Sequence, residues 1–209
     1  MCGNSRFADL AVFSFHPVKH IACGEGGMIT YQREDMYKNI SLLRTHGITK
    51  DPQLMHEYHG GSYYEMQELG FNYRLTDFQA ALGSSQLKRA DEGLGRRKAI
   101  AMKYAEAFNN MEGVLGHSGY IEGHAYHLYV VEVEDRVGLY NHLRANNIFA
   151  QVHYIPVHLL PYYKSLGWGK GDFPVAEQYY QHCLSLPMYP TLTEEEQDYV
   201  VNQIKKYLS

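Results

Sequence analysis

The chain has 209 residues, of which 45% are hydrophobic and 20% charged, the profile of a soluble globular protein that can bury a sizeable core. Its 19 basic and 23 acidic residues give a formal net charge of −4, so no basic surface for nucleic acid or an anionic membrane is expected. There is no apolar run near the roughly 20 residues of a membrane span and no signal-peptide pattern. Three scattered cysteines, Cys2, Cys23 and Cys183, do not form a disulfide framework, and the sequence predicts a cytoplasmic protein.

The first fifty residues combine short apolar runs with turn residues. The runs Leu10–Phe13 and Met28–Tyr31 predict strands, the first of the continuous apolar kind that is buried inside an α/β sheet. The segment Glu34–Arg44 is predicted to be a helix that ends before Gly47. Its apolar face consists of Met36, Ile40 and Leu43.

Residues Thr49–Gly61 are polar and lack periodicity, so they are predicted to form a loop. The next helix is expected to begin at Thr76, where Thr76 and Gln79 have the spacing of a capping box. Its predicted buried stripe is Phe78, Ala81 and Leu82. Gly93 and Gly95 each cost about 1 kcal/mol in a helix relative to alanine. They are therefore expected to interrupt the following helix at a domain boundary, which divides the chain into residues 1–92 and 93–209.

The second part is predicted to be a smaller α/β unit. Tyr129, Val131 and Val133 alternate with Glu132 and Glu134, which predicts a strand with one more solvent-exposed face, and Ile148–Tyr154 is expected to be another strand. Predicted helices carry Val137, Tyr140 and Leu143 on one face, cover Val175–Leu184, and start at Thr193 with a capping box to Glu196.

Lys19 is the candidate for chemistry. It lies between two histidines, His16 and His20, beside a proline and apolar residues, and three glycines follow within Gly24–Gly27. Partial burial or a nearby cation frees a lysine amine to form a Schiff base. Ser14 could hold a phosphate with its hydroxyl, and the glycines let the backbone pass close to a ring. The alternative is an ordinary snorkelling lysine beside a glycine hairpin.

A metal site is not favoured, although the chain has 12 histidines and His153 and His158 are five residues apart. Structural zinc sites have further His, Cys or carboxylate ligands in a compact pattern, and the sequence has none here.

Five stretches resemble the DegT/DnrJ/EryC1/StrS family of pyridoxal-phosphate-dependent nucleotide-sugar aminotransferases. They are residues 13–30, 42–51, 64–83, 151–157 and 185–188. The resemblance implies an α/β fold that is the C-terminal part of a PLP-dependent transferase of fold type I: the remainder of the large-domain sheet, carrying the Schiff-base lysine, and a small C-terminal α/β domain. It also implies transamination of a nucleotide-linked keto sugar with an amino-acid donor, usually glutamate.

The resemblance assigns roles to six residues. It places Lys19 at the lysine that binds pyridoxal phosphate covalently and then acts as general base. Ser14 is placed at the cofactor phosphate, and Asn72 at the phosphate of the neighbouring subunit's cofactor, which implies a dimer. Arg74, His153 and Tyr154 are expected to contact the substrate. A sugar dehydratase of the same family is disfavoured, because those enzymes have histidine at the lysine position.

The resemblance covers only the back half of the family's site. The aspartate for the pyridine nitrogen, the stacking residue and the phosphate-gripping turn are expected in a front half that precedes Phe13 in the family. Two functions follow: an aminotransferase that works with a separately encoded front half or a complete partner chain, or a catalytically silent fragment. Without the front half, an exposed sheet edge and apolar face are expected to cause poor solubility or oligomerisation.

Overall fold

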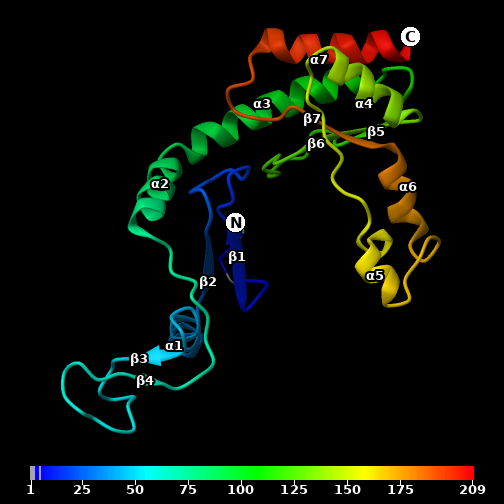
Figure 1. Ribbon diagram of the computed structural model, residues 1–209. Helices are drawn as coiled ribbons and strands as arrows, with labels where there is room; N and C mark the ends of the chain where they lie inside the picture. The colour runs from blue at the N-terminus through cyan, green and yellow to red at the C-terminus, as the bar shows by residue number, and fades with distance from the viewer. Residues whose placement is uncertain (1–2, 5) are drawn as a thin grey trace. The chain divides into compact units, whose positions relative to one another are not determined.

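The computed structural model describes residues 3–4 and 6–209, so that Cys2 lies outside the described residues. The chain divides into two compact units, unit 1 (residues 1–90) and unit 2 (Asp91–Ser209). Figure 1 shows both along the chain, with unit 1 in blue to teal and unit 2 in green to red.

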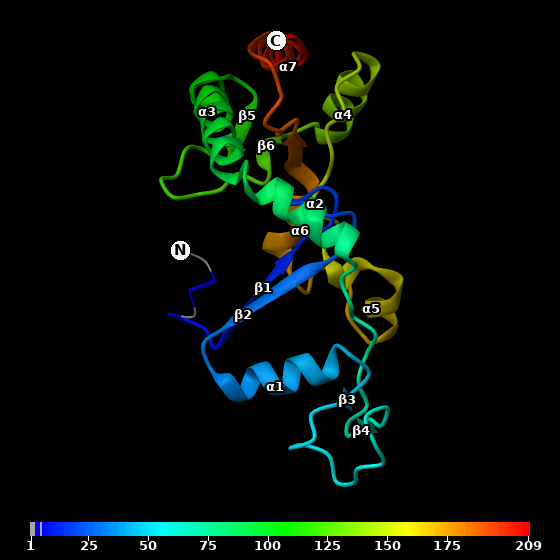
Figure 2. The same cartoon turned by 90° about the vertical axis from the view of Figure 1, so that its left-hand side faces the viewer.

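In chain order, the described part of unit 1 forms β1 (Leu10–Ser14), β2 (Gly27–Tyr31), α1 (Glu34–Leu43), β3 (Ile48–Thr49), β4 (Glu65–Met66) and α2 (Asp77–Leu87). The predicted strands, the helix after them and the polar loop are thereby confirmed. β1 pairs with β2 and β3 with β4, each pair antiparallel. Figure 2 shows the β1–β2 hairpin and the helix α1 that follows it.

The expectation that the first strand is buried on both faces is wrong. β1 alternates exposed and partly buried residues, and Val12 is 71% exposed. An antiparallel hairpin has one face that can remain open to solvent. Within the described residues, β2 is the strand that pairs with β1, so no larger sheet covers it.

The start of α2 is as predicted, but its buried stripe is not. Thr76 Oγ1 accepts a hydrogen bond from the backbone N–H of Gln79, and the side chain of Gln79 accepts one from the N–H of Thr76. Phe78 is nevertheless 81% exposed, and Ala81 and Leu82 are exposed as well. Local capping fixes where a helix begins, whereas burial of its apolar face needs a layer that no described element of unit 1 provides.

Unit 2 forms α3 (Ala90–Phe108, whose first residue belongs to unit 1), β5 (Val114–His117), β6 (Tyr129–Val133), α4 (Arg136–Ala145), a 3₁₀ turn (Val157–Leu159), α5 (Pro161–Ser165), α6 (Pro174–His182), β7 (Cys183–Leu186) and α7 (Glu194–Leu208). The strands form one antiparallel sheet in the order β5-β6-β7. The second capping box is confirmed, because Thr193 Oγ1 and the side chain of Glu196 make both of its hydrogen bonds.

The expected interruption at Gly93 and Gly95 is wrong, since α3 runs through both glycines. Tertiary hydrogen bonds hold this part of the helix. Arg96 donates to the carbonyl of Leu192 at 2.6 Å, and the buried Arg97 donates to the carbonyl of Met188 at 2.8 Å. Charge-assisted hydrogen bonds of this kind offset the roughly 1 kcal/mol that each glycine costs.

Two other boundaries differ from the predictions. Ile148–Tyr154 is not assigned as a strand and has only an isolated bridge from Gln151 to Ser185. The helix predicted over Val175–Leu184 ends at His182, because the chain continues as β7 beside β6. Pairing with a neighbouring strand is a nonlocal effect that a single-segment pattern does not contain.

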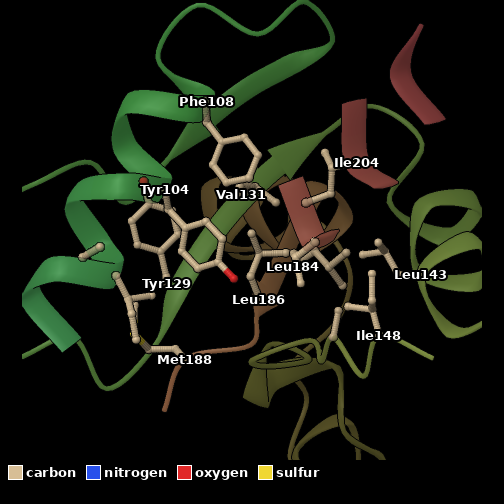
Figure 3. Packing of buried hydrophobic residues seen from close by; sticks show 14 of the residues in the cluster. Tyr104, Phe108, Tyr129, Val131, Leu143, Ile148, Leu184, Leu186, Met188 and Ile204 are labelled. Carbon is tan, nitrogen blue, oxygen red and sulfur yellow. The ribbon is translucent and has the colours of Figure 1, made fainter. Parts of the chain in front are cut away.

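The hydrophobic core of unit 2 lies between its sheet and its helices. Figure 3 shows Tyr104 and Phe108 of α3 packed against Tyr129 and Val131 of β6, with Leu184 of β7 and Ile204 of α7 beside them. The Tyr104 ring centroid is 5.7 Å from that of Phe108 and 5.1 Å from that of Tyr129. Unit 2 therefore has a closed aromatic and aliphatic core.

Candidate functional site

Lys19 sits at the end of a tight turn that follows β1. Its backbone N–H donates to the carbonyl of His16 at 2.9 Å, and Pro17 occupies the second position of this turn, which its fixed φ favours. The Lys19 side chain is partly buried, and no described carboxylate forms an ion pair with it. The turn therefore presents an amine that is not held by a counter-ion within the described residues.

The loop around Lys19 is closed by backbone hydrogen bonds and by glycine. The N–H of Phe15 donates to Gly26, and the N–H of Cys23 donates to Phe15. A Cβ on Gly27 would lie 2.7 Å from the carbonyl oxygen of Phe13, closer than real Cβ contacts occur. Only glycine fits at this position, so the close approach of the two strands in the β1–β2 hairpin accounts for Gly27, as the alternative of a glycine hairpin predicts. An approach of the glycines to a cofactor ring stays a prediction.

Two further candidates in unit 1 have polar groups directed to backbone or solvent. Ser14 Oγ accepts a weak hydrogen bond from the N–H of His16 at 3.4 Å, and this leaves its hydroxyl proton for another acceptor. Asn72 forms a backbone bridge with Thr45, and its exposed side-chain amide has no hydrogen bond to any described residue. Both groups could donate to a phosphate.

Arg74 lies two residues after Asn72 and lines a cavity of about 430 Å³ within unit 1. Its guanidinium is exposed and makes no ion pair with a described residue. The five other residues that line this cavity were not predicted as site residues. They come from the turn after α1, from β3 and the residue that follows it, and from the segment before β4. No local sequence pattern brings the segments around residues 45–50, 64 and 74 together.

In unit 2, His153 and Tyr154 lie on the chain beside β7. The Nδ1 atom of His153 is 2.8 Å from the hydroxyl of Ser185, and the His153 ring packs edge-on against Tyr154 at 4.7 Å between centroids. Tyr154 is 70% exposed. His153 is thus oriented by β7, while Tyr154 presents its ring to solvent; their contact with substrate stays a prediction.

His158, which the sequence pairs with His153 by spacing, has a different partner. Its Nε2 atom is 2.8 Å from Oε1 of Glu177 on α6, and both side chains are less than 10% exposed. The same carboxylate oxygen accepts the N–H of Gly171 at 2.7 Å. Glu177 therefore ties the loop 166–173, which carries Trp168, to α6. Sequence reasoning missed this contact, because 19 residues separate its two side chains.

The Glu177 contact predicts a pH-dependent loop. The hydrogen bond from His158, then that from Gly171, lowers the pKa of Glu177 below its ordinary value. The contribution of the Glu177 carboxylate to folding stability is therefore fully present at a pH above its pKa in the unfolded chain, about 4.3. This contribution is lost as the pH falls through the lowered pKa of Glu177 in the folded chain. Amide exchange of residues 166–173 and Trp168 fluorescence should report loosening on acidification. In Glu177→Gln, amide exchange of residues 166–173 should already be fast at neutral pH. Glu112→Gln, which changes an exposed carboxylate, should behave as the parent chain. Unchanged amide exchange in Glu177→Gln would contradict the role of the carboxylate.

No group of three or more His, Cys, Asp and Glu side chains gathers into a metal site within residues 3–4 and 6–209. Of the helices in the same part of the chain, none is long and apolar enough to cross a bilayer.

Comparison with known proteins gives consistent matches along the chain. The spore coat polysaccharide biosynthesis protein SpsC of Bacillus subtilis is 38% identical over 206 residues, which are 94% of this chain and 53% of SpsC. UDP-4-amino-4,6-dideoxy-N-acetyl-beta-L-altrosamine transaminase of Campylobacter jejuni is 34% identical over 200 residues, 92% of this chain and 50% of that protein. The chain thus spans about half the length of these relatives.

The fold agrees with the same group of proteins. A Streptococcus pneumoniae protein proposed to be a sugar aminotransferase, solved in its PMP form, superposes with a TM-score of 0.87 at 32% identity. The superposition covers 98% of this chain and 54% of that structure, as expected for part of a fold-type-I transferase. The family model described as the DegT/DnrJ/EryC1/StrS aminotransferase family matches residues 3–205. The chain belongs to the DegT/DnrJ/EryC1/StrS aminotransferase family.

Proposed function

We propose that the chain is the lysine-bearing part of a pyridoxal-phosphate-dependent aminotransferase that acts on a UDP-linked 4-keto-6-deoxy amino sugar, with glutamate as the amino donor. The observation that carries the proposal is the turn at residues 16–19, which presents the amine of Lys19 without a described counter-ion, in a chain matched by the family over residues 3–205. The product would enter bacterial surface-glycan or nonulosonic acid synthesis in the cytoplasm. The name of SpsC, a spore coat polysaccharide biosynthesis protein, supports a role in surface-glycan synthesis.

The residues present fit the cofactor in part. Lys19 would hold its aldehyde carbon covalently and, once released, would move a proton at the substrate carbon as general base. The hydroxyl of Ser14 and the side-chain amide of Asn72 are free to donate to phosphate oxygens. When bound, pyridoxal phosphate supplies the electron sink that stabilises negative charge at the substrate carbon. Arg74, His153 and Tyr154 would orient the sugar nucleotide.

A partner polypeptide is part of this proposal. The relatives are about twice as long, and the acid for the pyridine nitrogen is expected from the half that the chain does not match. Unit 1 exposes apolar side chains that such a partner would cover, among them Phe7 at 90% and Phe78 at 81%. We infer association with a complementing half or formation of a homodimer, in which Asn72 reaches the cofactor of the neighbouring subunit.

The proposal is tested by trapping the cofactor on Lys19. The chain is incubated with pyridoxal phosphate, alone and with a polypeptide that supplies the other half of a relative, and is then reduced with borohydride. Mass spectrometry should find a phosphopyridoxyl group on Lys19 in preference to the exposed Lys38 of α1. Equal labelling of all lysines, or none on Lys19 in either sample, would overturn the proposal.

The second candidate is a chain that folds and associates without transamination. The coverage of only about half of each relative favours it, because a site that lacks its pyridine-nitrogen acid has a weakened electron sink. Labelling of Lys19 without turnover of amino donor, even after the complementing half is added, would select this second candidate.

A further inference from the structure

Glu65 carries a charge and is nevertheless less exposed than its two neighbours. It is the first residue of β4, and its side chain is 11% exposed. Tyr64 and Met66, on either side of it, are 54% and 60% exposed. Removing a carboxylate from water is costly unless hydrogen bonds compensate for the lost hydration. The hydrogen-bond partners of Glu65 therefore indicate what this carboxylate does.

The Glu65 carboxylate accepts its hydrogen bonds from the loop between β3 and β4, residues 50–64, which Figure 1 shows in cyan. The N–H of His56 donates to Oε2 at 2.8 Å, and the N–H of Glu57 donates to Oε1 at 2.7 Å. The Nδ1 atom of His56 is 3.1 Å from Oε2, and the hydroxyl of Tyr63 donates to Oε1 at 3.4 Å. Two successive backbone N–H groups directed at one anion form an anion-binding nest. Here the anion in the nest is a side chain of the same unit.

These hydrogen bonds keep Glu65 ionised at neutral pH. The N–H of His56, which has the largest effect, and then that of Glu57 lower the pKa of Glu65 to about 2, although burial raises it. The carboxylate of Glu57 does not compete for the same donors, because it lies 2.9 Å from Nε2 of His59. Hydrogen bonds to an ionised acceptor are about twice as strong as neutral ones. Glu65 is therefore a strong, charged acceptor for the backbone of the loop.

Within the described residues, few other hydrogen bonds hold this loop. Those that connect residues 52–62 to chain outside the loop end on Glu65 and on Gln67, whose side-chain amide donates to the carbonyl of Leu54. A Cβ on Gly60 or Gly61 would meet no atom within 4 Å, so the far part of the loop is not packed. Loops of this length are uncommon unless they serve a site or stay mobile. The order of the loop therefore depends largely on the Glu65 carboxylate.

Both ends of the loop line the cavity beside Arg74. Lys50 and Tyr64 are among its lining residues. Thr49 faces Glu65 in the antiparallel register of β3 and β4, and Lys50 and Tyr64 are the next residues on each side, where the ladder ends. Beyond the ladder, the contacts of Glu65 hold the backbone that joins these two residues. The positions of two walls of the cavity thus depend on the conformation of the loop.

We propose that Glu65 is a positioning residue, whose carboxylate holds the loop 50–64 in the conformation that fixes Lys50 and Tyr64 at the cavity beside Arg74. Glu65 acts through the loop and not by contact with a substrate. Its effect on a reaction rests on the proposed function, in which Arg74 orients the sugar nucleotide. The anchoring of the loop is a property of the chain alone and is measured without any reaction.

Amide exchange of the full chain at neutral pH tests the anchoring. Glu65→Gln keeps the size of the side chain but has one acceptor oxygen, so its amide group opposes the second N–H of the nest. Exchange of residues 52–62 should become roughly 10- to 100-fold faster, the effect of losing one charge-assisted hydrogen bond, while α1 and α2 exchange as before. Glu65→Asp keeps the charge and should recover part of the protection. Glu68→Gln, which changes an exposed carboxylate three residues further on, should behave as the parent chain.

Kinetics of the chain combined with its complementing half test the positioning role. Glu65→Gln should raise the KM for the sugar acceptor roughly 10-fold and leave kcat and the KM for glutamate unchanged, the pattern of lost binding without lost chemistry. Glu65→Asp should lie between Glu65→Gln and the parent chain, and Glu68→Gln should match the parent. An unchanged KM for the acceptor in a Glu65→Gln variant whose loop exchanges faster would overturn the positioning role.

The results separate this proposal from the proposed function. Faster exchange confined to the loop in Glu65→Gln, with no Schiff-base trapping on Lys19 in the parent chain, would support the anchoring and overturn the aminotransferase proposal. Trapping on Lys19 with unchanged exchange in Glu65→Gln would overturn only the assignment of Glu65. Exchange that becomes equally faster in α1, α2 and the loop would also overturn it, because Glu65 would then stabilise unit 1 as a whole.

Discussion

Lys19→Ala should abolish transamination by the chain combined with its complementing half. One side chain has two tasks here, covalent attachment of the cofactor and movement of a proton at the substrate carbon. A general base alone contributes about 10²- to 10⁴-fold, so the rate should fall by at least about 10³-fold. The amine stands at a turn closed by the Lys19 N–H bond to His16, which the substitution leaves intact. The measurement is amino-group transfer from glutamate to a panel of UDP-linked 4-keto sugars.

Two comparisons show whether the lost amine is the cause. Lys19→Arg keeps a cation but forms no stable Schiff base, and it should be as inactive as Lys19→Ala. Added methylamine should restore part of the proton transfer to Lys19→Ala, since it replaces the missing base. Lys38→Ala, on exposed α1, should keep full activity. Retention of activity in Lys19→Ala would overturn the role of Lys19.

Local signals in the sequence predict local structure well in both units. The capping boxes at Thr76 and Thr193 place two helix starts correctly, because each needs only contacts three residues apart. The alternating residues of β6 likewise give both its position and its buried face. Features that depend on contacts between residues far apart in the sequence are not predicted. No element among the described residues of unit 1 covers the apolar stripe of α2. α3 continues through Gly93 because Arg96 and Arg97 donate hydrogen bonds to the carbonyls of residues 192 and 188.

The candidate site follows the same division. Lys19 and the glycines after it are visible in one stretch of sequence, and the structure forms a turn at residues 16–19 and a hairpin with a close backbone approach at Gly27. The approach of the glycines to a cofactor ring stays a prediction. The cavity beside Arg74 depends on the β3–β4 register and on a bridge across 27 residues, from Thr45 to Asn72. The Glu177 contact with His158 depends on a helix and a loop far apart in the chain. Residue types alone do not specify such contacts between segments far apart in the sequence.

The largest stability effect is expected at Phe108, the last residue of α3. It is 1% exposed, and its ring packs on Tyr104, at 5.7 Å between centroids, and on Tyr129 and His117, each at 6.4 Å. Phe108→Ala removes these contacts and leaves a cavity between α3 and β6. Core substitutions of this kind cost about 3–5 kcal/mol, so most of the stability of a small unit would be lost.

The measurement is urea unfolding followed by amide exchange in α3 and β6, which reports on unit 2 alone. Phe149→Ala is the matched control, because Phe149 is 63% exposed and has a cation–π contact with Arg144 at 4.9 Å. Loss of that exposed contact should cost about 1 kcal/mol or less. Phe108→Leu, which fills much of the space, should fall between the two. If Phe108→Ala and Phe149→Ala lowered the free energy of unfolding equally, burial of Phe108 in the core shown in Figure 3 would not explain its contribution to stability. The description of unit 2 as a closed core would then be wrong.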